Sequence, residues 1–470
     1  MSIRRGLIIG WMLAGMQVLS VGQNPSTQTS GDDSARQAPA TALSAIAGME
    51  QEGVVEDTSS TLPQIPSILG GTGVSTAFLS ELQRSNYLRG GVNVGATYDD
   101  NALLAATGQQ SNTSETIFPN IKIEETSSRT RWSLGYAGGL TVNQKITNQN
   151  QGSHNLNFDS QFRLSPHVNL RGAEVFSLTS GLFDSGNGSG AVGSGGPNQS
   201  VLAPLSTQRS SITTVGTNYH FALNDLVGAS GSFYDLHFTN GPKGAPLTNS
   251  QTASGSAFWL HRLFRRNWAG ASYRFDRITF NPGSGESLVH GFFAVDTLNL
   301  GSHFTLSGFI GPQRSENQAV PLGGSQIIQS KAWSVAGGAE GGWQDARTSL
   351  SAGYSRSVSD GGGVLGSVLL QSVHANFRRE LVPGWAAAFT VNHGANQAVI
   401  PSAGNANSIN LTSAGFSLER NVGKSIGLRF GYTHDFQQNF GVLGTTQNLG
   451  AHRNRVFATL SYQWAKPLGM

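Results

Sequence analysis

Histidine, serine and acidic residues are the side chains to search first for catalysis in this chain. The eleven histidines are scattered singly, and serine is so abundant that a serine near a histidine is expected by chance. There is no G-x-S-x-G elbow at a strand-to-helix junction and no H-E-x-x-H motif. His434 and Asp435 are adjacent, so on a strand their side chains point to opposite faces. The sequence therefore predicts no catalytic residue and no enzyme.

The acidic run Asp99, Asp100 and Asn101 is the best candidate for a metal site. Carboxylate and amide oxygens are ligands that Ca²⁺ accepts. The alternative, which we favour, is a turn at the end of a strand. The chain has no cysteine, so thiolate metal sites and thiol nucleophiles are excluded. We accordingly predict no metal and no cofactor.

Several charged residues lie in segments where apolar and polar residues alternate. They occupy the positions that share a strand face with the polar and small residues. These candidates for the lining of a pore are Arg131, Arg163, Arg171, Arg274, Arg429, Asp159 and Asp276. Rings of charge in a pore bias its ion selectivity. The excess of arginine predicts a mild preference for anions. In the alternative, the arginines pair with carboxylates of the lumen and brace the wall.

The segments that hold these residues have a period of two from Tyr87 onward. In residues 426–433 and 455–464, apolar side chains alternate with polar or very small ones. Successive side chains on a strand point to opposite faces, so each such strand has one apolar face. Between residues 87 and 464 we count about 18 such strands, within a range of 16–18. The predicted fold is all-β: an antiparallel up-and-down transmembrane barrel.

Composition and connections support this architecture. Charged residues make up 12% of the chain, about half of the roughly 25% usual in soluble domains. Beyond the first residues no apolar run is long enough for a transmembrane helix, whereas a barrel strand needs an apolar residue only at every second position. Short turns alternate with long connections, which is typical of outer-membrane barrels with short periplasmic turns and long extracellular loops. A lumen of 16–18 strands is too wide for side chains to fill, so water enters it.

Six tryptophans adjoin the short turns and form a predicted aromatic girdle: Trp132, Trp259, Trp268, Trp343, Trp385 and Trp464. Tryptophan is enriched at membrane interfaces because it joins an apolar ring to a hydrogen-bonding N–H. The alternative is a set of strand-end tryptophans in the core of a soluble barrel.

The ends of the chain carry further signals. Arg4 and Arg5 precede an apolar run, which predicts a signal peptide over residues 1–23 and export. Residues 24–86 are acidic and rich in Ser, Thr, Ala and Pro. We expect a flexible periplasmic leader, which could act as a plug or dock a periplasmic partner. The barrel then occupies 87–464, and 465–470 form a periplasmic tail.

The chain resembles porin-like, largely uncharacterised bacterial outer-membrane β-barrel proteins. The resemblance rests on Tyr98 to Asn101 (YDDN), on Phe162 to Leu170 (FRLSPHVNL), and on the final strand, where Trp464 follows Leu460 and Tyr462. That last pattern is similar to the C-terminal signal recognised by the barrel-insertion machinery. The resemblance implies the outer membrane of a Gram-negative cell, contact with outer-membrane lipid, and a homotrimer as one assembly.

The function predicted from these observations is a porin-like channel for passive diffusion of small polar solutes. The first alternative is a barrel for polysaccharide export or surface-assembly scaffolding, which the acidic leader would suit. The second alternative is a barrel hydrolase. The formal net charge of +3 is too small over this length to indicate nucleic-acid binding.

Overall fold

The computed structural model consists of strands joined by turns. It describes residues 86–147, 150–180, 207–239, 247–281, 285–300, 303–319, 328–362, 365–400, 408–423, 425–440 and 449–468. The predicted signal peptide and almost all of the predicted leader lie outside these residues. The strands are β1 Tyr87–Asp99, β2 Asn112–Thr126, β3 Thr130–Asn143, β4 Gln151–Arg163, β5 Val168–Ser180, β6 Thr207–Ala222, β7 Asp225–Thr239, β8 Asn249–Phe264, β9 Asn267–Asn281, β10 Gly285–Leu300, β11 Phe304–Ala319, β12 Ile328–Gln344, β13 Thr348–Gly361, β14 Leu365–Val382, β15 Trp385–Ala398, β16 Ser408–Val422, β17 Ile426–Phe440 and β18 Leu449–Pro467.

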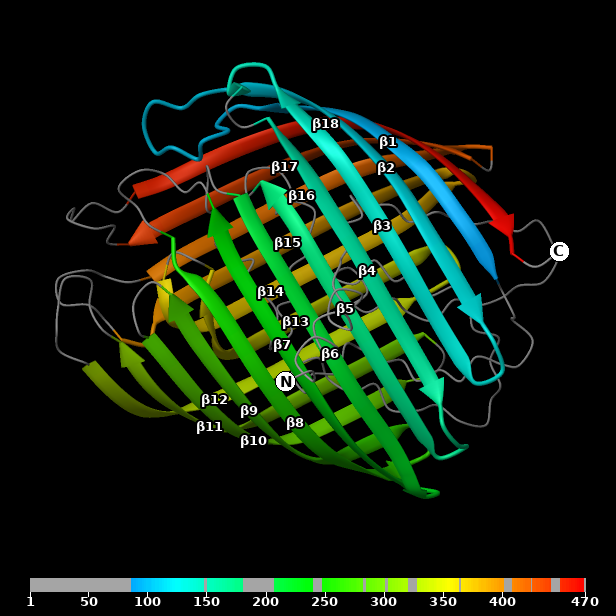
Figure 1. Ribbon diagram of the computed structural model, residues 1–470, viewed down its shortest axis with the longest axis vertical. Helices are drawn as coiled ribbons and strands as arrows, with labels where there is room; N and C mark the ends of the chain where they lie inside the picture. Colours follow the sequence, from blue (N-terminus) through cyan, green and yellow to red (C-terminus); the bar gives the residue numbers. More distant parts are fainter. Residues whose placement is uncertain are drawn as a thin grey trace, which may run out of the picture.

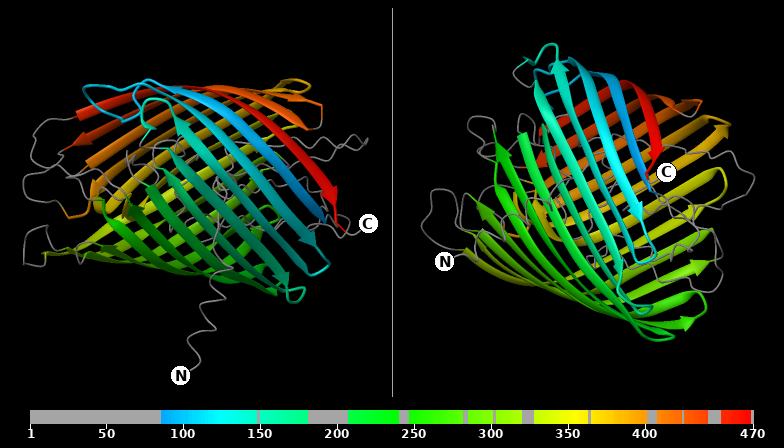
Figure 2. Two further views of the ribbon diagram at one scale, coloured as in Figure 1. Left: turned by 45° about the horizontal axis from the view of Figure 1, so that its top comes forward. Right: turned by 45° about the vertical axis from the view of Figure 1, so that its right-hand side comes forward.

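The strands form one closed antiparallel sheet. Each pairs with its neighbours in sequence, and β1 pairs with both β2 and β18. In Figure 1 the blue β1 lies beside the red β18, which closes the cylinder, and Figure 2 shows the strands tilted steeply around it. Both the barrel prediction and the estimate of about 18 strands are confirmed. Within the described residues no helix is long and apolar enough to cross a membrane.

The two faces of the strands differ as the alternation predicts. On β18, Val456, Leu460 and Trp464 are exposed on one face, whereas Arg453 and Arg455 are buried on the other. Directly paired residues of an antiparallel ladder share a face, so the registers extend this assignment from strand to strand. We call the face that exposes large apolar side chains the outer face and the opposite one the inner face.

The connections alternate in length around the barrel. Turns at one rim span only a few residues, and two of them place a glycine at positive φ, Gly384 (82°) and Gly423 (65°). At the opposite rim, β5 ends at Ser180 and β6 begins at Thr207. The last strand is longer than expected, because Pro467 still pairs with Tyr87. The predicted tail from residue 465 is therefore strand as far as Pro467.

The wall is irregular at one place. The ladder between β12 and β13 runs only from Gly337 opposite Arg356 to Gln344 opposite Ser349. Beyond it, residues 328–336 of β12 have a partner strand in β11 but none in β13. The far end of β13 continues as a hairpin with β14, which we call the inner hairpin and define as residues 357–362 and 365–370.

Candidate functional site

The seven residues predicted to line a pore all lie on the inner face by register. Arg429, for example, is opposite Glu419, and Asp276 is opposite Val289. The structure does not gather them into one ring. Instead it distributes them among small ion-paired groups on different strands.

The most buried of these groups lies at the far end of β17 and β18, near the rim of the long connections. Asp435 accepts hydrogen bonds from Arg453 at 2.7 and 3.0 Å and from Arg455 at 3.1 Å. Ser413 donates to its other oxygen at 2.7 Å. Asp99 is opposite Arg455 in the ladder that closes the barrel, and it is 1% exposed. This group joins β16, β17, β18 and β1.

A second group lies nearer the short turns. Glu419 on β16 lies 3.4 Å from the guanidinium of Arg378 and 3.5 Å from that of Arg429. Arg429 also donates to Ser417 at 3.3 Å. One carboxylate here faces two cations, so the group is net positive.

Two further ion-paired groups occupy the first strands. Glu124 on β2 contacts Lys122 at 2.6 Å and Arg89 at 3.4 Å. Asp159 on β4 accepts from Arg171 on β5 at 2.9 and 3.1 Å. Together with the groups on β14–β18, they make one side of the interior an ionic wall.

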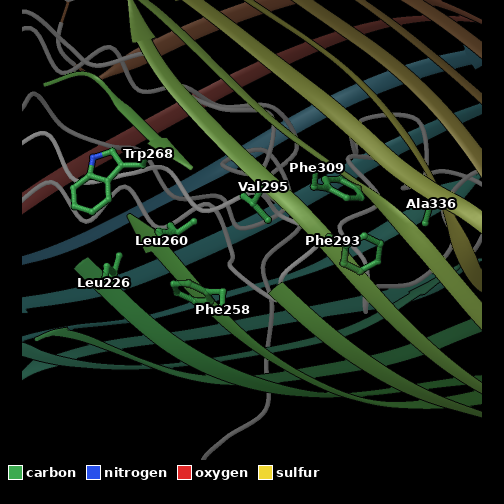
Figure 3. Packing of buried hydrophobic residues seen from close by; sticks show 8 residues of the cluster. All are labelled: Leu226, Phe258, Leu260, Trp268, Phe293, Val295, Phe309 and Ala336. Atoms are coloured by element: carbon green, nitrogen blue, oxygen red, sulfur yellow. The ribbon is translucent and has the colours of Figure 1, made fainter. Parts of the chain in front are cut away.

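The opposite side of the interior, formed by β7–β12, combines a large apolar cluster with a buried ion pair. Its inner face holds a buried cluster, shown in Figure 3: Leu226, Phe258, Leu260, Trp268, Phe293, Val295, Phe309 and Ala336. Phe293 and Phe309 meet edge to face with centroids 5.5 Å apart. An inner face built in this way is unusual for a barrel whose lumen faces water, since inner positions are then mainly polar.

The inner hairpin crosses this side of the interior near the rim of the long connections. Asp360 at its tip accepts a hydrogen bond from Ser250 on β8 at 3.1 Å. Ser367 is hydrogen-bonded to Ser287 on β10. Val358 packs with Ile278 and Val289 in a second apolar cluster. These contacts join strands that are not neighbours in the sheet, so the hairpin lies across the interior and narrows it.

Arg274 and Asp276 belong to β9, under the same region. Their side chains form a 2.6 Å ion pair and are 7% and 4% exposed. A pair buried so deeply is placed to stabilise the barrel wall and not to contact a solute.

Five of the six predicted girdle tryptophans lie on the outer face beside the short turns. The indole N–H groups of Trp132 and Trp259 donate to Glu125 and Asp225, each at 3.1 Å. Trp268 differs from the prediction, because it is 2% exposed and opposite Arg262 on the inner face. The turn before it fixes its place along the strand but not its face, and its ring packs into the apolar cluster.

The candidate calcium ligands form a turn. Asp99 accepts from the backbone N–H of Asn101 at 3.0 Å, and Asp100 accepts from the side chain of Asn454 at 2.6 Å. In the part of the chain that the structure describes, no three His, Cys, Asp or Glu side chains are grouped to hold a metal ion. The turn interpretation therefore fits these residues.

Sequence analysis missed several of the most buried charged residues. Asp435, Arg453 and Arg455 lie in one stretch of the chain, and their inner-face parity was the available signal. Glu419 and Arg378 also have inner-face parity, but their meeting with Arg429 depends on the register between strands. The folding of the inner hairpin into the interior had no local signal.

Among known proteins, only solved structures show a similarity to this chain, and that similarity is distant. No family model matches the chain, and no curated protein sequence does. Among solved structures, Pseudomonas aeruginosa OpdQ matches with 12% sequence identity and a TM-score of 0.42, over 82% of this chain and all of that one. OpdF (OccK2) from the same organism, solved with glucuronate, matches with 9% identity and a TM-score of 0.42, over 82% and 100%. The outer-membrane protein OpdK matches with 10% identity and a TM-score of 0.39, over 81% and 99%.

Proposed function

We propose that this chain is an outer-membrane channel through which small polar solutes diffuse passively, with a mild preference for anions. The observation that carries the proposal is the contrast between the two faces of a closed barrel. The outer face exposes apolar side chains, and one side of the inner face is lined by ion-paired groups. A closed sheet can lie in lipid because it leaves no open edge, and a polar inner face admits water.

The anion preference rests on the balance of charge on the inner face. Its bases in the described strands are Arg89, Lys122, Arg131, Arg163, Arg171, Arg262, Arg274, Arg378, Arg429, Arg453 and Arg455, and its acids are Asp99, Glu124, Asp159, Asp276, Glu340, Glu380, Glu419 and Asp435. Many of these arginines are paired, which agrees with the bracing alternative for those residues and reduces the expected preference. Cations remain in excess even when Asp360 of the inner hairpin, which also lies in the interior, is counted among the acids.

Planar bilayers test this function directly. Purified protein should give steady open steps in single-channel recordings, and its reversal potential in a KCl gradient should have the sign of anion preference. Arg429→Gln should lower that preference, and Arg379→Gln on the outer face should leave it unchanged. A clear cation preference would refute the charge argument. A barrel that never opens would favour the alternative of export or scaffolding.

A further inference from the structure

The break between β12 and β13 lies within the apolar band of the outer face. Trp343 and Trp333 on β12 are ten residues apart and both exposed. At about 3.3 Å per residue and a tilt of about 40°, they are roughly 25 Å apart along the barrel axis, which is the height of an apolar band in such barrels. The ladder stops at Gly337, so the break begins below Trp333 and inside this band.

Charged side chains mark the upper limit of the band on these strands. Arg314 is opposite Trp333, and Lys331 is opposite Glu316. Glu316 contacts Arg314 at 2.5 Å and Lys331 at 3.1 Å. This paired group is exposed, as expected where the wall meets water. The last residues before the break therefore face lipid and not solvent.

A free strand edge at this depth is unfavourable without an occupant. Lipid chains offer no partner to backbone N–H and C=O groups, which is why membrane sheets close. The inner hairpin does not pair with β12 at Trp333–Ala336, and no other described strand pairs with β12 on that side. Among the described residues, this edge of β12 is therefore open to a ligand.

Arg356 lies at the apex of the break and indicates what that ligand is. It is opposite Gly337 in the last residue pair of the ladder and on the outer face with Tyr354. Its Nε is buried with no hydrogen-bond partner, and among the described residues it has no ion pair. Ionisable residues inside a membrane are costly and usually functional. An arginine at this depth needs an anionic partner.

The outer surface beside Arg356 is apolar. Ile310, opposite Gly337, is 62% exposed, Val335 is 57% exposed and Trp333 is 68% exposed. A single cation beside such a surface matches a molecule with an anionic head and an apolar chain. Guanidinium binds carboxylate and phosphate groups through paired hydrogen bonds.

We propose that the break between β12 and β13 is a lateral binding site for an anionic amphiphile. The carboxylate or phosphate head binds Arg356, and the apolar chain lies along Ile310, Val335 and Trp333. The proposal rests on the membrane placement in the proposed function, but not on conduction. A peptide strand paired to β12 would cover the same edge, but it would leave Arg356 without an anionic partner.

Quenching of tryptophan fluorescence tests the site in the full chain, purified in a neutral detergent. The probe is 9,10-dibromostearate, whose bromines quench a nearby indole, and the Trp333→Phe variant identifies the part of the signal from Trp333. We expect saturable quenching of Trp333. Arg356→Gln should weaken binding by about tenfold or more, since it removes a charge-assisted contact. Arg356→Lys should weaken it less.

Controls separate this site from general uptake by the micelle. Arg379→Gln removes another outer-face arginine, beside the intact ladder near the short turns, and should bind like wild type. The methyl ester of the probe should bind wild type no better than it binds Arg356→Gln. The proposal fails if Arg356→Gln binds the acid as tightly as wild type, if Arg379→Gln loses as much, or if acid and ester bind alike.

A second probe identifies the source of the anion. Brominated phosphatidylglycerol replaces the fatty acid in the same titration. Binding through Arg356 by either probe supports the site, and the tighter one tells whether a free acid or a membrane lipid occupies it. Absence of Arg356-dependent quenching by both overturns it. Conductance of the same preparations is measured separately, so a silent channel would count against the proposed function and not against this site.

Discussion

Asp435 allows a quantitative test of the buried ionic group that joins the last strands to the first. Its carboxylate accepts from Arg453, Arg455 and Ser413 and is 2% exposed. Asp435→Asn keeps the shape but removes the charge, and it leaves both guanidinium groups buried without this carboxylate, with Asp99 opposite Arg455. Breaking a buried pair from one side costs about 3–5 kcal/mol, because the remaining charge is uncompensated. We expect Asp435→Asn to lower the free energy of unfolding by this amount.

A matched control lies on the outer face of the same barrel. Asp235 and Arg209 form a 3.4 Å pair whose side chains are 22% and 51% exposed. Exposed pairs contribute about 0–1 kcal/mol, so Asp235→Asn should have only a small effect. The two substitutions are chemically identical, and they differ in burial and in the number of arginines that lose a carboxylate partner.

The assay is urea unfolding and refolding in lipid vesicles, with folded and unfolded fractions resolved by tryptophan fluorescence. The midpoint and the slope together give the free energy of unfolding. The reasoning is refuted if Asp435→Asn loses no more stability than Asp235→Asn. In that case water or other groups would already neutralise the two arginines.

Three further experiments test other parts of the barrel. Gly270→Ala should destabilise the barrel by about 1–3 kcal/mol or more in urea unfolding, because its Cβ would clash with the carbonyl oxygen of Trp259 on the neighbouring strand β8. Gly255→Ala is the control and should be neutral, because its Cβ would have no atom within 4 Å. Cysteines at Ser287 and Ser367, which are hydrogen-bonded, should form a disulfide on oxidation without changing conductance; a change would mean that the inner hairpin moves. Glu419→Gln removes the carboxylate between two lumen arginines, so the reversal potential should shift further toward anion preference; a shift toward cations would contradict the assignment.

Much of the architecture follows from alternation alone. Strands such as β1 and β18 have a clean period of two, because one face meets an apolar medium and the other meets polar groups. Alternation weakens in residues 232–238 and 256–264, and the structure explains why. There Leu236 and Leu260 point inward onto an apolar wall while Phe233 and Trp259 point outward. Apolar residues on both faces remove the contrast on which the prediction depends.

The candidate site was harder to predict, because it depends on pairing between strands. Parity placed Arg429 on the inner face, but only the register brings it to Glu419. Trp268 shows the limit of position along a strand, since a residue beside a turn can face either way. Val358 has the outer-face parity of a lipid-facing residue, yet it is buried inside the barrel against Ile278. Nothing in the local sequence tells whether such a residue faces lipid or is buried inside the barrel.

The inner hairpin and the break between β12 and β13 have the same origin, because both arise where β13 stops pairing with β12. Residues 357–361 of β13 cannot pair with β12 and at the same time pack against β8–β10. Leaving the ladder forfeits backbone hydrogen bonds, each worth about 0.5–1.5 kcal/mol net. Burial of Val358 and the hydrogen bonds of Asp360 and Ser367 offset that loss. A ligand bound at Arg356 requires the open edge, so it binds only while the hairpin lies inside. The proposed ligand would therefore add to the stability of the arrangement in which the hairpin lies inside the barrel.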